Sequence, residues 1–108
     1  MTRRLDGGSQ RAEVPASPAP ERSEVERLRT RIAELDEQLV ATVNVRLETV
    51  AELVRHKREH GLPLVDPGRE EWLVEHLTAV NRGPLSPDAV ERLVRFVLEL
   101  TKDEVFVA

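Results

Sequence analysis

The chain has 108 residues, of which 40% are hydrophobic and 33% charged, with a formal net charge of −4 and no cysteine. This length allows one domain, the negative charge argues against a general nucleic-acid role, and the absence of cysteine excludes disulfides, zinc thiolate sites and a cysteine nucleophile. No apolar run approaches the roughly 18 residues needed to span a bilayer, and no apolar segment of a secretory signal follows Arg3 and Arg4. We therefore expect a cytoplasmic protein that binds neither nucleic acid nor membrane.

The N-terminal segment differs from the rest of the chain. Residues 1–22 hold two of the five glycines and three of the seven prolines, and they show no hydrophobic periodicity. Such a composition is typical of disorder. We expect a disordered tail over 1–22 and a single helical domain over 23–108.

A long helix is predicted from Ser23 to about His60. Ser23 and Glu26 form a capping box at its start, and Gly61-Leu62-Pro63 is a stop signal at its end. Apolar residues recur at steps of three and four, which indicates one buried face: Val25, Leu28, Ile32, Leu35, Leu39, Val43, Val50 and Leu53. At about 1.5 Å per residue, roughly 36 residues extend for about 54 Å, whereas a compact chain of this size has a radius of gyration of about 13 Å. The apolar face therefore predicts a homodimer with the long helices packed together.

Two shorter helices follow. Asp66-Pro67 predicts a second helix with Asp66 as N-cap and Pro67 at the first helical position, and Asn81-Arg82-Gly83-Pro84 ends it. Ser86-Pro87-Asp88 predicts the start of a third. The expected inner faces are Leu73, Val74, Leu77 and Val80 on the second helix, and Val90, Leu93, Val94, Val97, Leu98 and Thr101 on the third. The fold class is thus all-α: a three-helix chain with one long N-terminal helix.

Two cations share the register of the long apolar stripe. Arg46 and Lys57 are eleven residues, or three turns, apart, so they point the same way about 16 Å apart along the axis. Buried charges are unfavourable unless they are paired, which favours an anionic ligand. Arg29 lies roughly 25 Å before Arg46, and in an antiparallel dimer it comes alongside Arg46 of the other chain. The spacing predicts a site completed across the interface.

The full pattern covers about residues 24 to 105. It runs Leu28-Arg29-x-x-Ile32-x-x-Leu35-Asp36-x-x-Leu39, Arg46, Lys57, and then Gly61-Leu62-Pro63-x-x-Asp66-Pro67-x-Arg69-Glu70. In this order and spacing it resembles the all-α class of chorismate mutases, of the small monofunctional bacterial type. The resemblance implies an intertwined helical homodimer with two identical active sites. The implied activity is an isomerase that converts chorismate to prephenate by a Claisen rearrangement, in the shikimate pathway toward Phe and Tyr.

The resemblance also implies roles for individual residues. Arg46 and Arg69 would bind the two carboxylates of the substrate together with Arg29 of the partner subunit, and Lys57 would donate to the ether oxygen. The remaining positions are Asp66 and Glu70 at the ring hydroxyl, Thr101 beside a carboxylate, and Val105 at the end of the third helix.

This residue set suits a pericyclic reaction. Such a reaction needs no nucleophile, metal or general base, and we expect no cofactor and no metal. Holding the flexible dianion in its reactive conformer removes entropy from the barrier, and a fixed cation stabilises charge that grows on the breaking C–O bond. One departure is Val105, where the family usually has Gln and sometimes Glu, with Glu104 one residue away. A valine there implies low activity, a shifted substrate, or a partner enzyme that reshapes the C-terminus.

Three alternatives remain open from the sequence. A 4-amino-4-deoxychorismate mutase of an antibiotic pathway would place Asp66 against an ammonium group, and an isochorismate pyruvate-lyase would use the same Arg and Lys set. A non-catalytic dimerisation module is the third. Replacing Arg46 and Lys57 by Leu distinguishes the dimerisation module from the enzymes, because a pure scaffold becomes more stable whereas a ligand site loses function.

Overall fold

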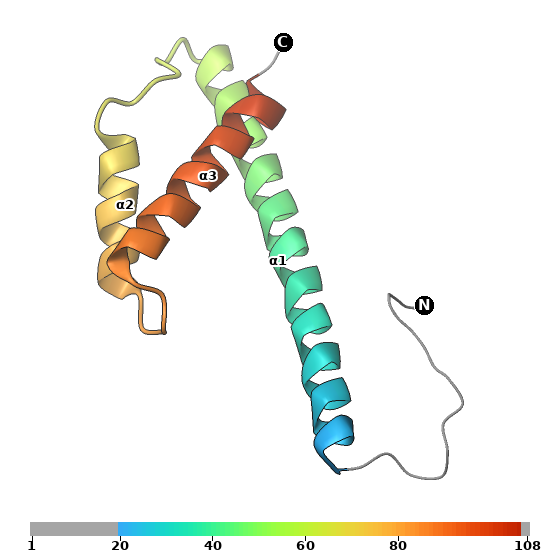
Figure 1. Ribbon diagram of the computed structural model, residues 1–108. Helices are drawn as coiled ribbons and strands as arrows, with labels where there is room; N and C mark the ends of the chain where they lie inside the picture. Colours follow the sequence, from blue (N-terminus) through green and yellow to red (C-terminus); the bar gives the residue numbers. More distant parts are fainter. Residues whose placement is uncertain (1–19, 107–108) are drawn as a thin grey trace. The chain divides into compact units, whose positions relative to one another are not determined.

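The computed structural model describes residues 20–106 and contains three helices. In chain order they are α1 (Pro20–Glu59), α2 (Arg69–Val80) and α3 (Pro87–Val105) (Figure 1). The described residues form no strand, so the all-α prediction of one long and two short helices is confirmed. Within the same range, no helix is both long enough and apolar enough to cross a membrane.

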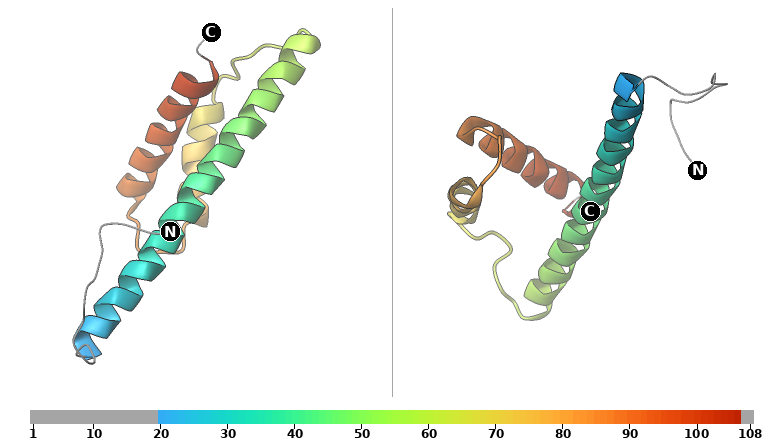
Figure 2. Two further views of the ribbon diagram at one scale, coloured as in Figure 1. Left: turned by 90° about the vertical axis from the view of Figure 1, so that its right-hand side faces the viewer. Right: turned by 90° about the horizontal axis from the view of Figure 1, so that it is seen from below.

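The chain divides into two compact units, and α1 contributes to both. Residues 20–40 of α1 belong to the first unit, and residues 41–59 belong to the second together with α2 and α3. The boundary between the units falls within this helix, which Figure 2 draws from two further sides. Its 40 residues correspond to about 60 Å.

The start of α1 differs from the prediction. The helix begins at Pro20, three residues before Ser23, so the capping box at Ser23 is wrong. Proline suits the first turn of a helix because its φ is already helical and its missing N–H has no partner to lose there. The acidic Glu21 in the same turn also complements the helix dipole. Residues 20–22 therefore lie in α1, and the rest of the predicted disordered tail lies outside the described residues.

The end of α1 agrees with the stop signal. Gly61 has a φ of 67°, the left-handed conformation that glycine adopts without strain. The Leu62 N–H donates to the Lys57 carbonyl at 2.8 Å and the Gly61 N–H to the Arg58 carbonyl at 3.4 Å. This pair of bonds is the Schellman motif, which satisfies carbonyls that the helix end leaves free. The prediction at Gly61 is confirmed.

The start of α2 corrects another prediction. The N-cap is Gly68, with φ 86° and ψ −11°, and not Asp66. The Arg69 N–H donates to the Asp66 carbonyl at 3.1 Å, so residues 66–69 form a β-turn. Proline at the second position and a glycine with positive φ at the third are typical of a type II turn. The Pro67-Gly68 pair therefore delays the helix until Arg69.

The start of α3 follows the predicted capping pattern. Ser86 is the N-cap, its side-chain oxygen accepts a hydrogen bond from the Ala89 N–H at 3.1 Å, and Pro87 opens the helix. The serine thus satisfies one of the backbone donors that a helix start leaves unpaired.

Ser86 and Ser23 provide a matched test of these helix starts. We expect Ser86→Ala to lower the free energy of unfolding by about 1 kcal/mol, because a capped N–H loses its acceptor. Ser23→Ala changes it by less than about 0.5 kcal/mol, because alanine is favourable inside a helix. Urea unfolding of both variants at one protein concentration measures the difference. An equal loss in the two variants would contradict the start of α1 at Pro20.

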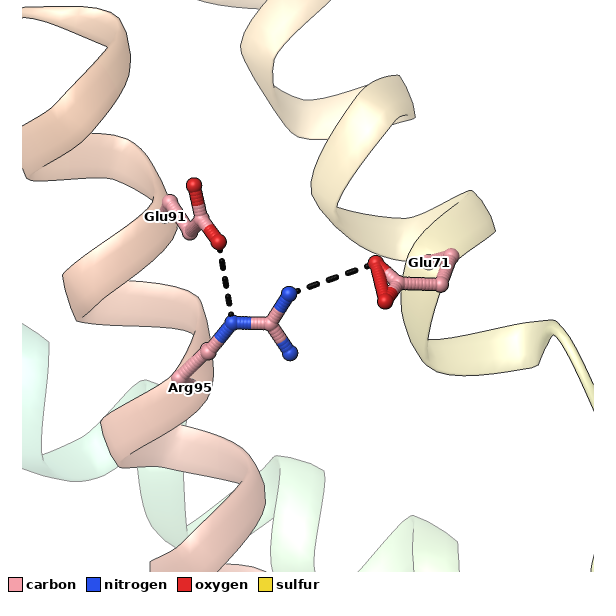
Figure 3. Close-up of polar contacts among 3 residues, drawn as sticks. All are labelled: Glu71, Glu91 and Arg95. Atoms are coloured by element: carbon pink, nitrogen blue, oxygen red, sulfur yellow. Dashed lines mark hydrogen bonds and ion pairs between the residues drawn. The ribbon is translucent and has the colours of Figure 1, made fainter.

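Ion pairs connect α2 to α3 in an antiparallel arrangement. Arg95 on α3 donates to Glu91 at 3.0 Å on its own helix and to Glu71 on α2 at 3.2 Å (Figure 3). Lys102 Nζ lies 3.4 Å from Glu70 Oε2. The hydrogen bonds that Arg95 donates to Glu91, first, and to Glu71 raise the pKa of Arg95 above its ordinary value. Both carboxylates at the start of α2 are therefore engaged by cations of α3.

The described part of one chain has a very small core. Of residues 20–106, only Val54, Val90, Val94 and Thr101 are buried. In the first unit, the apolar face of α1 is 44 to 58% exposed at Val25, Leu28, Ile32, Leu35 and Leu39. Val80 and Leu93, predicted to face inward, are also about half exposed, at 48% and 49%. A single chain thus leaves much of its apolar surface in contact with water.

Candidate functional site

Arg46 and Thr101 come together across 55 residues of sequence. Arg46 Nη1 donates to Thr101 Oγ1 at 2.7 Å, and Thr101 Oγ1 donates in turn to the Val97 carbonyl at 2.7 Å. Arg46 is half-buried and Thr101 is only 5% exposed. Because the hydroxyl proton is committed to Val97, the oxygen is fixed as an acceptor for Arg46. Thr101 therefore orients the guanidinium and leaves other N–H donors of Arg46 for a ligand.

Lys57 lies near the end of α1 and is half-buried. Its Nζ donates to the Leu64 carbonyl at 3.4 Å. The Schellman motif accounts for this contact, because the Lys57 carbonyl accepts from Leu62 and so turns the following loop back toward the lysine. An ammonium has three donors, and one weak backbone contact leaves two for a ligand.

Arg69 and Glu70 are the first two residues of α2, Asp66 lies in the turn before it, and all three are exposed. The Arg69 guanidinium lies 4.1 Å from the centroid of the Trp72 ring, and Glu70 pairs with Lys102. Within residues 20–106, no hydrogen bond or ion pair joins Asp66, Arg69 or Glu70 to Arg46 or Lys57. In the second unit, a hydrogen bond thus joins Arg46 of α1 to Thr101 of α3, whereas the Lys57 ammonium bonds only to the Leu64 carbonyl among the described residues.

Arg29 and Val105 complete the predicted set. Arg29 lies on the part of α1 in the first unit, where it pairs with Glu26 at 3.3 Å. Val105 is the last residue of α3 and is half-buried. It lines a surface hollow, and the other lining residues are Ala51, Val54, Arg55, Arg58 and Glu59. Val105 thus borders the last third of α1 on the side of Arg55 and Arg58.

Two contacting residues were not predicted. Trp72 is not among the predicted site residues, yet its ring lies under the guanidinium of Arg69. The spacing of three residues on one helix is a signal for this contact, because such residues are neighbours on the helix surface. Lys102 follows Thr101 directly and binds Glu70, and only the packing of α2 on α3 reveals this pair.

These residues are suited to binding an anion through cationic side chains. Arg46, Lys57 and Arg69 supply hydrogen-bond donors with positive charge, and Asp66 and Glu70 supply acceptors. In the described range, no group of three or more His, Cys, Asp or Glu side chains has the arrangement of a metal site. The set is suited to holding a small dianion that also carries a polar substituent.

Comparisons with known proteins identify the family. The sequence profile described as chorismate mutase type II matches residues 28–104. The bifunctional chorismate mutase/prephenate dehydratase of Pseudomonas aeruginosa is 31% identical over 83 residues, which cover 72% of this chain and 23% of the relative. The 4-amino-4-deoxychorismate mutase of Streptomyces venezuelae is 39% identical over 49 residues, or 45% of this chain and 48% of the relative. The chain thus spans less than half the length of these two curated relatives.

A solved structure supports the same assignment. Chorismate mutase from Thermus thermophilus, in its form II, superposes with a TM-score of 0.71 at 28% sequence identity. The alignment covers 77% of this chain and 94% of that chain. The likeness extends over nearly the whole of that enzyme and includes the three-helix architecture.

Proposed function

Because the chain belongs to the chorismate mutase type II family, we propose that it converts chorismate to prephenate by a Claisen rearrangement. The observation that supports this activity most directly is the half-buried Arg46, held by Thr101 at 2.7 Å with donors to spare. A scaffold helix gains nothing from an oriented cation in its apolar stripe, whereas a site for a dicarboxylate requires one.

In this proposal catalysis rests on positioning and on charge. The carboxylates of chorismate bind Arg46 and Arg69, which fixes the two reacting carbon atoms near each other and removes entropy from the barrier. As the ether C–O bond breaks and the new C–C bond forms, negative charge grows on the ether oxygen. Lys57 donates to that oxygen and stabilises the transition state more than the ground state. Asp66 and Glu70 accept from the ring hydroxyl.

The active enzyme in this proposal is a homodimer. The apolar face of α1 is exposed from Val25 to Leu39 in one chain, and burying it needs a second copy with a matching face. Arg29 lies on the same part of α1 as this face. We place Arg29 of the partner subunit at a carboxylate in each of the two sites.

A second substrate is favoured by one specific observation. The similarity to the Streptomyces venezuelae 4-amino-4-deoxychorismate mutase is 39% over 49 residues, a higher identity over a shorter segment than the bifunctional relative shows. Chorismate carries a hydroxyl on its ring at the position where 4-amino-4-deoxychorismate carries an ammonium group. Asp66 is exposed at the turn before α2 and as a carboxylate accepts from either group.

The test is an assay with both substrates. Loss of chorismate is followed in the ultraviolet, and the products of chorismate and of 4-amino-4-deoxychorismate are identified by chromatography. A kcat/KM that is higher for chorismate, with prephenate as product, supports the first proposal, and a higher value for the amino compound supports the second. Turnover of neither by a folded protein would contradict both.

Val105 provides a prediction about the rate. We expect Val105→Gln to raise kcat about tenfold, because an amide adds a second donor for the ether oxygen and one well-placed donor contributes at least that much. Val105→Leu is the control, because it changes the size of the side chain without adding a donor. A glutamine variant no faster than the leucine variant would contradict direct contact of position 105 with the substrate. It would favour a partner enzyme that reshapes the C-terminus.

A further inference from the structure

Trp72, the only tryptophan in the chain, contacts two other side chains on α2. The Arg69 guanidinium lies 4.1 Å from the centroid of its ring. The His76 ring is stacked on the same indole, with centroids 4.6 Å apart and an interplanar angle of 11°. Residues at spacings of three and four share one face of a helix. Arg69, Trp72 and His76 thus form a column on α2.

The acids next to Arg69 do not neutralise it. Glu70 pairs with Lys102 and Glu71 with Arg95, so both carboxylates are engaged by α3. Among the described residues, no hydrogen bond or ion pair involves the guanidinium of Arg69, whereas those of Arg27 and Arg29 are each bound to a glutamate. The partner of Arg69 is the indole ring.

This contact restricts the guanidinium and leaves its donors available. An exposed arginine side chain has many rotamers, and holding one of them to bind an anion costs conformational entropy. A ring beneath the guanidinium occupies only its flat face. The N–H groups point outward in the plane of the group, where they bind a carboxylate with two parallel bonds. His76, stacked on the indole, limits the orientations of the ring itself.

We propose that Trp72 is a positioning residue that presents the Arg69 guanidinium to a carboxylate of the substrate. The inference rests on the proposed function, which places Arg69 at that carboxylate. Trp72 itself touches no reacting atom. Its contribution is to reduce the disorder of Arg69 before the substrate arrives, an effect on binding that is equal in the ground state and the transition state.

The kinetics of two variants distinguish the effect of the Trp72 ring face from the effect of the size of the side chain. Trp72→Leu keeps an apolar side chain but has no ring face, and we expect KM for chorismate to rise about two- to fivefold, the size of an exposed cation–π contact. The kcat stays unchanged, because uniform binding is lost. Trp72→Phe keeps a ring and recovers most of the wild-type KM. In an Arg69→Ala background, Trp72→Leu has no further effect, because the two residues act as a unit.

Three outcomes would overturn the inference. The first is an unchanged KM in Trp72→Leu. The second is a lower kcat at constant KM, which signals a loss of folded enzyme. The third is an effect of Trp72→Leu that is as large in the Arg69→Ala background as in wild type. A readout without substrate separates this inference from the proposed function. The Arg69 side-chain protons lie over the indole, so their NMR signals are shifted upfield and return to ordinary values in Trp72→Leu. If wild type turns over no chorismate, the proposed function fails, and the presence or absence of this shift still decides whether Trp72 holds Arg69.

Discussion

Replacing Lys57 by methionine is expected to lower kcat by a factor of about 10² to 10³, the effect of removing one donor to a developing oxyanion. Methionine keeps an unbranched side chain of similar length, so the half-buried packing at the end of α1 changes little. The KM for chorismate stays close to its wild-type value, because the charge on the ether oxygen appears in the transition state and not in the substrate.

Stability and a second cation provide the controls for this result. The free energy of unfolding of Lys57→Met stays equal to the wild-type value or rises, since a partly desolvated ammonium is removed. Arg92→Met removes one exposed cation from α3, and it leaves both kcat and KM unchanged. If Lys57→Met retained kcat within a factor of ten, Lys57 would act only as a favourable charge at a helix C-terminus.

Local signals predicted the fold where they were unopposed. The glycine at 61 and the serine at 86 have the predicted conformation or hydrogen bond, because each acts through its own backbone neighbourhood. The two wrong helix starts are places where signals compete. Ser23 offers a cap, but Pro20 already suits a first turn, and Asp66-Pro67 offers a helix start, but Gly68 completes a turn. Sequence spacing alone does not show which of two competing start signals forms the helix N-terminus.

The candidate site was predictable only in part for a related reason. Arg46 and Lys57 occupy positions of the apolar stripe of one helix where an apolar residue is expected, so the periodicity itself singles them out. The contact of Arg46 with Thr101 joins residues 55 positions apart, and no local pattern carries that information. The contact of Arg69 with Trp72 is local, but an arginine and an aromatic residue three positions apart also occur on ordinary surfaces. The proposed role of Arg29 involves a second chain, which no local pattern describes.

Mixing two inactive variants is expected to restore activity. Arg29→Ala lowers kcat/KM by about 30-fold or more, the loss when one partner of a buried charge pair is removed, and Lys57→Met lowers it further. In a mixed dimer, one site takes its Lys57 from the Arg29→Ala chain and its Arg29 from the Lys57→Met chain. That site is intact, and the other carries both substitutions. Random pairing makes about half of the dimers mixed, so the mixture regains about a quarter of wild-type activity.

The pair Arg46→Ala and Lys57→Met is the matched control. Both residues lie on the second unit of the chain and, in the proposed site, come from the same subunit. A mixed dimer of these variants then has one defect in each site, and no activity returns. The measurement is chorismate turnover after the two chains of each pair are refolded together, compared with each variant alone. Recovery in neither mixture would mean that Arg29 acts within its own chain or not at all.

In the proposed dimer, Arg29 loses its ion pair with Glu26 when it binds the substrate in the site of the second chain. In one chain it pairs with Glu26 at 3.3 Å, and both side chains are largely exposed, at 72% and 65%. Such a surface pair contributes little to stability, so exchanging it for a desolvated carboxylate is favourable. In the proposed dimer, the exposed apolar residues from Val25 to Leu39 supply the association energy, and Arg29 beside them supplies the charge. Recovery in the first mixture and not in the second would assign association and substrate binding to the same segment of α1.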